Sequence, residues 1–352
     1  MKIRRKLKKK TKVILGTSIG CLLLIGLFFT FPKLLQKEET REQKEEFTPE
    51  IEAPKLQILN PNSNTRPIAV MINNHNQARK FHAGLQDAYI VYEMIVEGGI
   101  TRMMALYKDA TTEKIGSIRS ARHYFLDYAL ENDAIYTHWG YSEYAMNDIK
   151  KLGVNNINGL VDGKYFWKDT KLKVATEHTG FSSMSLINQA IDRFGYQKTT
   201  NEKPLLNYSI DPINLSEIEG AIPANQVLIK YSGSANTSYE YDAENKNYKR
   251  SVNGNPHMDY EKNFQYTAKN ILTYQVKNTT ITGDAKGRQD LNNIGSGEGY
   301  FISEGYAIPI HWKKQTRTGK TTYKLKNGED LIVNDGNTYI QIQPVGQTLT
   351  IS

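Results

Sequence analysis

Charged residues of opposite sign gather in one stretch that is otherwise rich in apolar, β-forming residues. The run YIVYEMIVEGGITRMMALY places Glu93 and Glu97 before two glycines and Arg102 after them. Two such runs joined by a glycine pair predict a β-hairpin, and a two-residue loop would put these three side chains on one face. In a cleft, that face could bind or transform a ligand. A solvated face with one Glu–Arg ion pair is an equally simple interpretation.

Two more guanidinium groups follow the hairpin in the run IGSIRSAR. Arg119 and Arg122 are three residues apart, so they would be neighbours on one face if a helix has begun there. Guanidinium groups bind carboxylates and phosphates through paired hydrogen bonds, which predicts an anionic ligand. Salt bridges to Asp127, Glu93 or Glu97 are at least as good an explanation of the two arginines.

Histidines and amides complete the set of candidate site residues. The members are Asn73, Asn74, His75, His138, Trp139 and His178. His138 and Trp139 end a predicted strand at a glycine, where side chains often line a cleft, although a buried His138 beside a core Trp139 is an even alternative. The spacings match neither HExxH, nor GxSxG, nor GxxxxGK[ST]. Metal binding would require distant histidines to converge in space, so we predict no metal and no cofactor.

The elements that would position these residues change character along the chain. Ser142 predicts the start of a helix that ends at Gly153, and Ser182 or Ser183 predicts one that ends at Gly195. After about residue 205 the pattern turns into short alternating runs separated by Gly, Asn and Asp. One of its turns, NGNPHMDY, carries His257 and Asp259. We expect these two side chains to be exposed, or else to approach a ligand. The fold class predicted is α/β (α+β), with an α/β N-terminal domain and a β-rich C-terminal domain.

The N-terminal part predicts a membrane anchor. Residues 13–31 are 19 residues without a charge, and a helix of that length spans roughly 28 Å, about the thickness of the bilayer core. Basic residues before it predict a cytoplasmic N-terminus. The expected organisation is a basic tail (1–12), a single transmembrane helix (13–31), a flexible stalk (32–65), an α/β domain (66–204) and a β-rich domain (205–352).

Composition limits the function further. Eight of the 45 Lys and Arg residues lie among the first twelve positions, so the remaining chain carries 37 basic and 37 acidic side chains. That neutral body argues against nucleic-acid binding. Cys21 is the only cysteine, which excludes disulfides and a cysteine nucleophile from the exported part. An uncleaved anchor is favoured over a lipid-modified Cys21 or a cleaved signal peptide, because the longest apolar run follows the cysteine.

Several motifs resemble those of a known family. RPIAVMINNH, the hairpin run, IGSIRSAR, YTHWG and, later in the chain, NPHMDY and GEGYFIS are similar to the YerB-like family of bacterial envelope lipoproteins. The resemblance covers nearly all of the chain from Arg66 onward. It implies an extracytoplasmic location and a layered α/β sandwich with N- and C-terminal family domains. The family is a domain of unknown function, so it makes Ser120 and the other motif residues site candidates without assigning them a role.

These observations predict a membrane-anchored, extracytoplasmic envelope protein. We expect its N-terminal domain to bind an anionic cell-wall component through Arg102, Arg119 and Arg122. A first alternative is a cell-wall hydrolase that uses Glu93 or Glu97, with His138 as a further catalytic candidate. The α-carbons of the two glutamates would lie roughly 13 Å apart on a strand, which favours a single catalytic carboxylate. A second alternative is a scaffold for envelope protein partners.

Overall fold

The structure is a computed structural model that describes residues 56–352. The predicted tail, transmembrane helix and most of the stalk lie outside the described residues. Within residues 56–352, no helix combines the length and the apolar character needed to cross a membrane. Residues 56–65, expected in the stalk, instead belong to the folded body: Leu59 is buried, and the carboxylate of Asp335 accepts a hydrogen bond from the backbone N–H of Ile58 at 2.9 Å.

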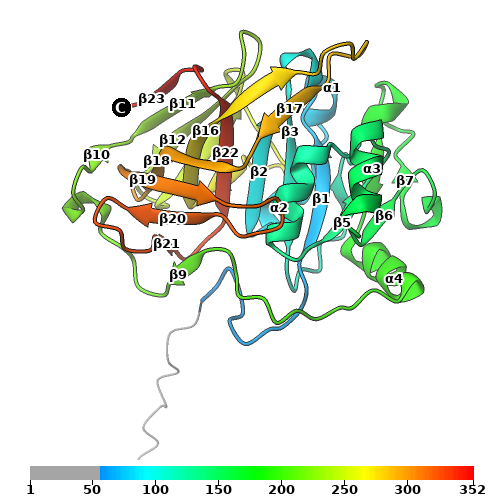
Figure 1. Ribbon diagram of the computed structural model, residues 1–352, viewed down its shortest axis with the longest axis horizontal. Coiled ribbons are helices and arrows are strands. Elements are labelled where there is room, and N and C mark those ends of the chain that lie inside the picture. The colour runs from blue at the N-terminus through cyan, green and yellow to red at the C-terminus, as the bar shows by residue number, and fades with distance from the viewer. Residues whose placement is uncertain (1–55) are drawn as a thin grey trace, which may run out of the picture. The chain divides into compact units, whose positions relative to one another are not determined.

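A twelve-stranded sheet forms the centre of the molecule (Figure 1). From one edge to the other its main strands are β10 (Ile222–Pro223), β19 (Tyr306–Lys314), β18 (Gly295–Ser303), β16 (Asn270–Thr280), β22 (Thr338–Pro344), β2 (Ile90–Ile95), β3 (Thr101–Tyr107), β1 (Ile68–Asn73), β5 (Ile135–His138) and β6 (Asn156–Asn158), while β17 (Gln289–Asn292) pairs with β16 and β20 (Thr322–Leu325) with β19. The late strand β22 runs parallel to both β2 and β16. It therefore joins the two halves of the sequence into one sheet.

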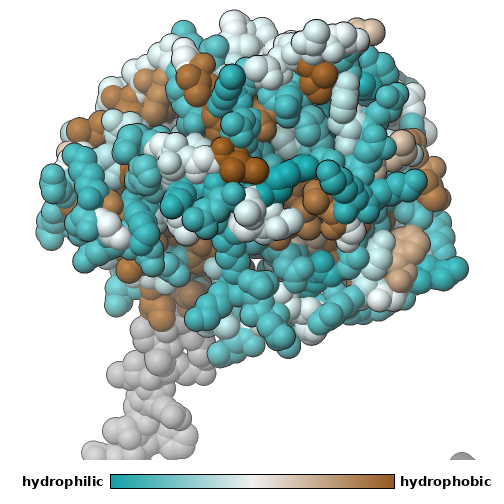
Figure 2. Space-filling model, in the orientation of Figure 1, coloured by the Kyte–Doolittle hydropathy of each residue, from teal (hydrophilic) through white to brown (hydrophobic). Residues whose placement is uncertain are grey.

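Every residue of β1, β2, β3 and β22 is buried. Strands covered on both faces read as continuous apolar runs, which explains IAVMIN and TRMMALY. The described residues share one extended hydrophobic core, and residues 56–352 belong to one compact unit. Figure 2 shows one outer face, which is mainly hydrophilic with hydrophobic side chains in small separate groups.

A second, six-stranded sheet packs on one face of the central sheet. Its strands are β14 (Asn255–Pro256), β13 (Asn247–Val252), β12 (Asn236–Asp242), β11 (Gln226–Lys230) and β23 (Leu349–Ile351) in spatial order, with β15 (Thr267–Ala268) paired to β13. The Tyr231 hydroxyl donates to Gln341 of β22 at 2.9 Å, which joins the two layers. The alternating buried and exposed residues of β11 and β13 confirm the predicted β-rich C-terminal half.

The helices and short turns lie around the two sheets, and α2 packs on the face of the central sheet opposite the six-stranded sheet. The helices are α1 (Asn76–Arg79), α2 (Leu126–Glu131), α3 (Glu143–Lys151) and α4 (Met184–Phe194), and the short 3-10 turns are η1 (Leu85–Asp87), η2 (Glu97–Gly99), η3 (His123–Phe125), η4 (Gly163–Tyr165), η5 (Thr176–His178) and η6 (Leu215–Glu217). The Tyr92 hydroxyl of β2 donates to Glu131 of α2 at 2.7 Å. Ser142 and Ser183 cap α3 and α4 as predicted, and Gly195 ends α4 in the left-handed region at φ 67°.

Two small sheets complete the fold. One consists of β4 (Ile115–Gly116), β8 (Gly180–Ser182) and β7 (Trp167–Lys168), and the other of β9 (Asn207–Ser209) and β21 (Ile332–Asn334). Figure 1 shows β6, β7, α3 and α4 gathered at one end of the central sheet. The candidate site lies at that end.

The hairpin between β2 and β3 exists, but the predicted register is wrong by one residue. Its loop is the turn η2 instead of the two glycines alone, and the N–H of Val96 donates to the carbonyl of Ile100 at 2.8 Å. Met94 is therefore paired with Arg102, and Glu93 with Met103. Because a shift of one residue moves each side chain to the other face, Glu93 and Arg102 lie on opposite faces of the sheet.

Candidate functional site

Glu93 is fully buried between the central sheet and the six-stranded sheet. One of its carboxylate oxygens accepts from the side chains of Asn74 at 3.0 Å and Thr101 at 2.7 Å. The other accepts from Arg250 of β13 at 2.7 Å, and Thr237 contacts both oxygens at 3.2 Å. A buried ion pair with several hydrogen bonds leaves no room for substrate, so this geometry favours a structural role for Glu93 and Asn74.

Arg250 begins a chain of hydrogen bonds that crosses between the two sequence halves. Its guanidinium donates to Nδ1 of His257, and His257 contacts His82 at 2.7 Å. Nε2 of His82 lies 2.5 Å from the carbonyl of Asn73 and must carry the proton there, because a carbonyl only accepts. Nδ1 of His82 therefore accepts from Nε2–H of His257. Burial lowers the pKa of His82 to about 3 and that of His257 well below its usual value.

The histidine and the aspartate of the NPHMDY turn are thus not exposed, contrary to the sequence prediction, although the residues around them are. His257 is buried, and so is Asp259, whose carboxylate accepts from the N–H of Gly84 at 3.0 Å and from the hydroxyl of Tyr266 at 2.8 Å. Sequence reasoning also missed Arg250 and His82. Nothing local indicated either of them, because their partners come from the other half of the chain.

Glu97, Arg102 and Arg122 form a second, largely closed cluster. Arg122 makes a bidentate contact with the Glu97 carboxylate, one hydrogen bond being 2.9 Å, and Arg102 lies 3.7 Å from it. Arg102 also donates to the carbonyl of Ser120 at 2.7 Å, and Arg122 to that of Ala121 at 2.8 Å. A Glu–Arg ion pair is thus present at this hairpin, but it lies in a mostly buried cluster instead of on a solvated face. Two of the three arginines expected to bind a ligand are therefore occupied by Glu97 and backbone carbonyls.

The protonation of this cluster matches an ion pair. Burial alone would raise the pKa of Glu97, but the hydrogen bonds and charge of Arg122, together with the charge of Arg102, hold it at about 2. Burial, reinforced by the charge of Arg122, lowers the pKa of Arg102 to about 9. At neutral pH Glu97 and Arg102 are both ionised. Glu97 is then unsuited to act as a general acid.

His138 is buried in the core. Nδ1 lies 2.8 Å from the carbonyl of Gly140, and Nε2 lies 3.1 Å from the side-chain oxygen of Asn156. Both ring nitrogens are engaged, and burial lowers the pKa of the imidazole. This arrangement matches the buried, hydrogen-bonded alternative.

An open pocket begins where β5 ends. Its volume is about 270 Å³, and its lining residues come from the segments after β4 and β5, from β7 and from the turn η5: Ile118, Arg119, Ser120, Trp139, Gly140, Tyr141, Leu160, Lys168, Thr176, Glu177 and Gly180. The structure therefore brings Arg119, Ser120 and Trp139 to one pocket. Lys168 and Tyr141 are lining residues that the sequence analysis missed, and the isolated WK dipeptide gave no periodic signal for them.

Trp139 is held firmly in this pocket. An added Cβ at Gly159 would lie 2.7 Å from its indole ring, and one at Gly180 would lie 2.6 Å from it. The ring therefore needs glycine on both sides. Lys168 Nζ lies 5.4 Å from the ring centroid, a cation–π distance.

Arg119 has the most accessible guanidinium of the predicted set. Its side chain is 28% exposed and donates to the carbonyl of Glu177 at 3.3 Å and to the carboxylate of Glu177 at 3.4 Å. The Glu177 side chain is itself 56% exposed, and such pairs are worth little. Lys168 has no carboxylate partner among the residues described. The pocket therefore presents two cations that an anion could reach.

His75 and His178 lie beside Arg119. Their rings stack with centroids 4.6 Å apart and planes 6° apart. The side chain of Asn73 contacts Nδ1 of His178 at 2.9 Å. Of the predicted residues, Asn73, His75 and His178 thus accompany Arg119, whereas Asn74 and Glu93 face the buried interface. Among residues 56–352, no group of three or more His, Cys, Asp or Glu side chains could hold a metal ion.

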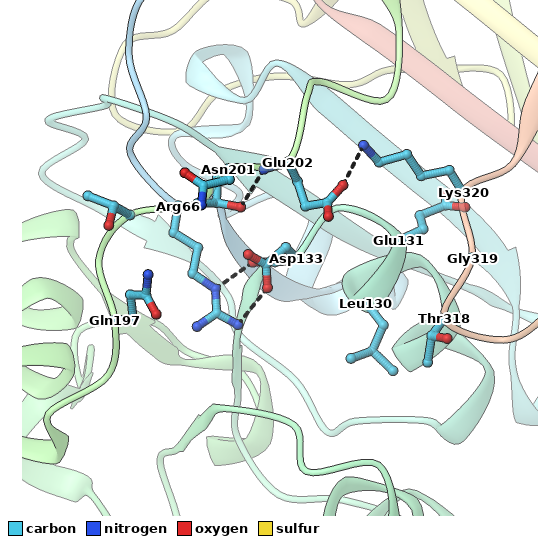
Figure 3. Close-up of a pocket in the computed structure, with 12 residues that line it drawn as sticks. Arg66, Leu130, Glu131, Asp133, Gln197, Asn201, Glu202, Thr318, Gly319 and Lys320 are labelled. Atoms are coloured by element: carbon cyan, nitrogen blue, oxygen red, sulfur yellow. Dashed lines mark hydrogen bonds and ion pairs between the residues drawn. The ribbon is translucent and has the colours of Figure 1, made fainter.

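Another hollow, of about 530 Å³, lies between segments of both halves and has its charges paired (Figure 3). Arg66 contacts Asp133 at 3.0 Å, and Lys320 contacts Glu202 at 2.9 Å. A groove of about 1010 Å³ beside residues 56–62 contains Lys262, which contacts Asp87 at 3.3 Å. Each of these three cations contacts a carboxylate, whereas Lys168 contacts none among the residues described.

Comparison with known proteins shows the family. Residues 56–197 match the N-terminal domain, and residues 227–340 the C-terminal domain, of the family described as "Protein of unknown function (DUF3048)". The chain is 31% identical over 294 residues to the Bacillus subtilis protein named "Putative lipoprotein YerB", covering 82% of this chain and 84% of that protein.

The crystal structure of YerB from Bacillus subtilis is similar as well, with a TM-score of 0.72 and 28% sequence identity. The match covers 85% of this chain and 99% of the solved chain, so in that relative an equivalent part folds without further segments. These matches also bear out the resemblance seen in the motifs. The protein therefore belongs to the YerB-like family, whose members carry the DUF3048 N- and C-terminal domains.

Proposed function

We propose that the protein is an extracytoplasmic binding module that recognises an anionic component of the cell wall at the pocket beside Trp139. The observation that carries this proposal is the pair of accessible cations, Arg119 and Lys168, that line one pocket together with an aromatic ring. The relative named a lipoprotein supports a membrane-attached, extracytoplasmic location. Attachment through residues 13–31, or through a lipid on Cys21, belongs to the same proposal.

The charges of the lining favour an anion. Arg119 and Lys168 face one acidic lining residue, Glu177, which is largely exposed. An incoming carboxylate or phosphate could replace Glu177 at the guanidinium at little cost, because the existing contact is 3.4 Å long and solvated. Arg102 and Arg122 stand directly behind the pocket and donate to the carbonyls of Ser120 and Ala121. Their charges raise the electrostatic potential at the pocket, although their guanidinium groups are already hydrogen-bonded within the protein.

The aromatic wall favours a ligand with a flat, partly apolar face. Trp139 and Tyr141 provide such surfaces, and the ring of Trp139 is held in place by its neighbours. Leu160 on the rim is 65% exposed. A sugar unit that carries an anionic group would satisfy both the rings and the cations, as a wall glycan with its attached acidic groups does.

The hydrolase alternative is less favoured. Glu93 is fully buried in an ion pair, Glu97 is held ionised by two arginines, and His138 has both nitrogens engaged. No pair of free carboxylates faces the Trp139 pocket, although glycoside cleavage typically needs two carboxylates across one bond.

The test uses residues 56–352 incubated with purified peptidoglycan that retains its attached polymers. Pelleting of protein and release of fragments, followed by mass spectrometry, are measured in the same tubes. We expect pelleting without fragments. The double substitution Arg119→Gln with Lys168→Gln should reduce the pelleted fraction at least tenfold.

The matched control also removes two positive charges, but from positions outside the pocket. Lys277 and Lys313 are exposed and outside the pocket, so Lys277→Gln with Lys313→Gln should pellet like the wild type. Equal losses in the two double variants would show a nonspecific charge effect and contradict the proposal. Released fragments would show an enzyme, and a lack of pelleting would favour a protein partner.

A further inference from the structure

Three side chains next to the pocket form a donor group that the function proposed above does not use. Asn73 ends β1, His75 follows two residues later, and His178 ends η5. The carbonyl of Glu177 accepts from Nδ2 of Asn73 at 3.5 Å and from Arg119 at 3.3 Å. This shared acceptor ties the histidine pair to the guanidinium of Arg119.

The orientation of the Asn73 amide is fixed by the backbone. Its side-chain oxygen accepts from the N–H of His75 at 3.2 Å, so the nitrogen must be on the other side. That nitrogen contacts Nδ1 of His178 at 2.9 Å and can only donate. Nδ1 of His178 is therefore an acceptor, and the neutral ring carries its proton on Nε2.

The tautomer of His75 follows in the same way. Its Nδ1 accepts from the backbone N–H of Gln77 at 3.3 Å, so the neutral ring carries its proton on Nε2 as well. Within the part of the chain that the structure describes, no group accepts a hydrogen bond from Nε2 of either ring, and neither atom is enclosed. Two N–H donors beside Arg119 are thus unused.

Both rings are neutral at neutral pH. Burial and the positive charge of Arg119 lower the pKa of His75, and burial, His75 and Arg119 lower that of His178. The cluster therefore offers one positive charge and two neutral donors. Its rings lie in parallel planes with centroids 4.6 Å apart.

We propose that Arg119 and the Nε2–H groups of His75 and His178 form a phosphate-binding site. The identity of the ligand as a wall component rests on the function proposed above, and this inference adds that its anionic group is a phosphate. A carboxylate presents two oxygens in one plane, whereas a phosphate presents three acceptor oxygens around a tetrahedral centre. Donors from two parallel planes and a guanidinium match the tetrahedral group better.

The experiment follows imidazole ¹⁵N signals of residues 56–352 during titration with inorganic phosphate at constant ionic strength and pH 7. The chain has seven histidines, so the signals can be assigned by substitution. We expect those of His75 and His178 to report Nε2–H tautomers and to shift together to saturation. Acetate at the same ionic strength should leave them unchanged. Shifts of equal size with acetate, or no shift with phosphate, would overturn the inference.

Two variants separate binding from positioning. Arg119→Gln should weaken phosphate binding at least tenfold and leave both tautomers unchanged. Asn73→Asp replaces the donor to His178 with an acceptor, so it should move the His178 proton to Nδ1 and weaken binding. Asn73 is buried, so if the Asn73→Asp variant does not fold, the Arg119→Gln variant alone tests the inference. His311→Ala, at an exposed histidine far from the site, is the control and should bind like the wild type.

Competition distinguishes two sources of phosphate. A phosphodiester that competes as well as inorganic phosphate points to a wall polymer, and one that competes poorly points to the terminal phosphate of a lipid carrier. Either result supports a phosphate site. Pelleting that depends on Arg119 and Lys168, combined with silent histidine signals, would leave the proposed function standing and refute this inference. Phosphate binding without pelleting would refute the proposed function and support this inference.

Discussion

Arg250 and Arg119 each lie beside one glutamate and two histidines, yet their surroundings differ. Arg250 is fully buried with Glu93, and it donates to His257, which contacts His82. Arg119 is 28% exposed, and its carboxylate partner is 56% exposed.

The two clusters differ in whether their hydrogen bonds are closed. In the Arg250 cluster each ring nitrogen has a partner inside the protein, and the last proton is accepted by a backbone carbonyl. In the Arg119 cluster Nδ1 of each ring has a partner, whereas no described group accepts a hydrogen bond from Nε2 of either ring. Similar residue types therefore connect the two sheets in the Arg250 cluster, whereas in the Arg119 cluster they are available to a ligand.

The largest effect is expected when Arg250 is removed from the buried cluster. Arg250→Met leaves the carboxylate of Glu93 buried without its counter-ion, and such a loss typically destabilises a protein by about 3–5 kcal/mol. Urea unfolding of residues 56–352 would measure the change in unfolding free energy. Lys277→Met, at an exposed position, should stay within about 0.5 kcal/mol of wild type.

The double variant Glu93→Gln with Arg250→Met sharpens the result. Because both charges are then absent, it should be more stable than Arg250→Met alone. An Arg250→Met protein that unfolds within about 1 kcal/mol of wild type would show that the buried pair does not hold the layers together.

A smaller effect is expected at the aromatic wall. Gly180→Ala would place a methyl group 2.6 Å from the Trp139 indole, so the ring or the strand must move. Overpacking of this kind costs about 1–3 kcal/mol. The tryptophan fluorescence should shift as well, while Gly153→Ala, where no atom lies within 4 Å of the added group, serves as a control for fluorescence. An unchanged spectrum and stability would contradict the clamped position of Trp139.

The buried histidines predict a loss of stability in mild acid. The folded pKa of His82 is about 3 and that of His257 is far below its usual value, whereas the unfolded value is about 6.5. The unfolded chain binds these protons first, so stability is fully present above pH 6.5 and is lost as the pH falls toward the folded values. Each histidine contributes a slope of about 1.4 kcal/mol per pH unit in that range.

Urea unfolding between pH 7 and pH 5 would measure this slope. His257→Gln removes one of these groups and should reduce the slope by about 1.4 kcal/mol per pH unit. If wild type and variant lose stability in parallel, other groups control the acid response.

Local features of this fold could be predicted from the sequence. Ser142, Ser183 and Gly195 act at the ends of their own helices, and the glycine pair does produce a hairpin. The register failed because the loop is longer than two residues, and a shift by one residue exchanges the two faces of a strand. Glu93 was consequently expected on the same face as Arg102, whereas it lies on the opposite face.

Distant pairings could not be predicted. Glu93 and Arg250 are 157 residues apart, and β22 enters the sheet beside β2. No local pattern specifies such a partner, so Arg250 and His82 were missed, and the buried His257 and Asp259 were expected to be exposed. For the candidate site, residue types predicted Arg119 and the histidines, whereas Lys168 required the fold.

The smallest effect on stability is expected at Arg119, although it lies only three residues from Arg122. The guanidinium of Arg119 makes two long, solvated hydrogen bonds, both to Glu177, so Arg119→Gln should change the unfolding free energy by less than about 0.5 kcal/mol. Arg122 is bidentate to Glu97, and Arg122→Gln leaves that carboxylate half-paired, so we expect a loss of about 1–3 kcal/mol. Urea unfolding of both variants, combined with the pelleting assay, gives the decisive contrast. If the guanidinium of Arg119 is available to a ligand, Arg119→Gln should reduce the pelleted fraction and hardly change the unfolding free energy. Equal destabilisation by the two variants would show that Arg119 is part of the structural cluster.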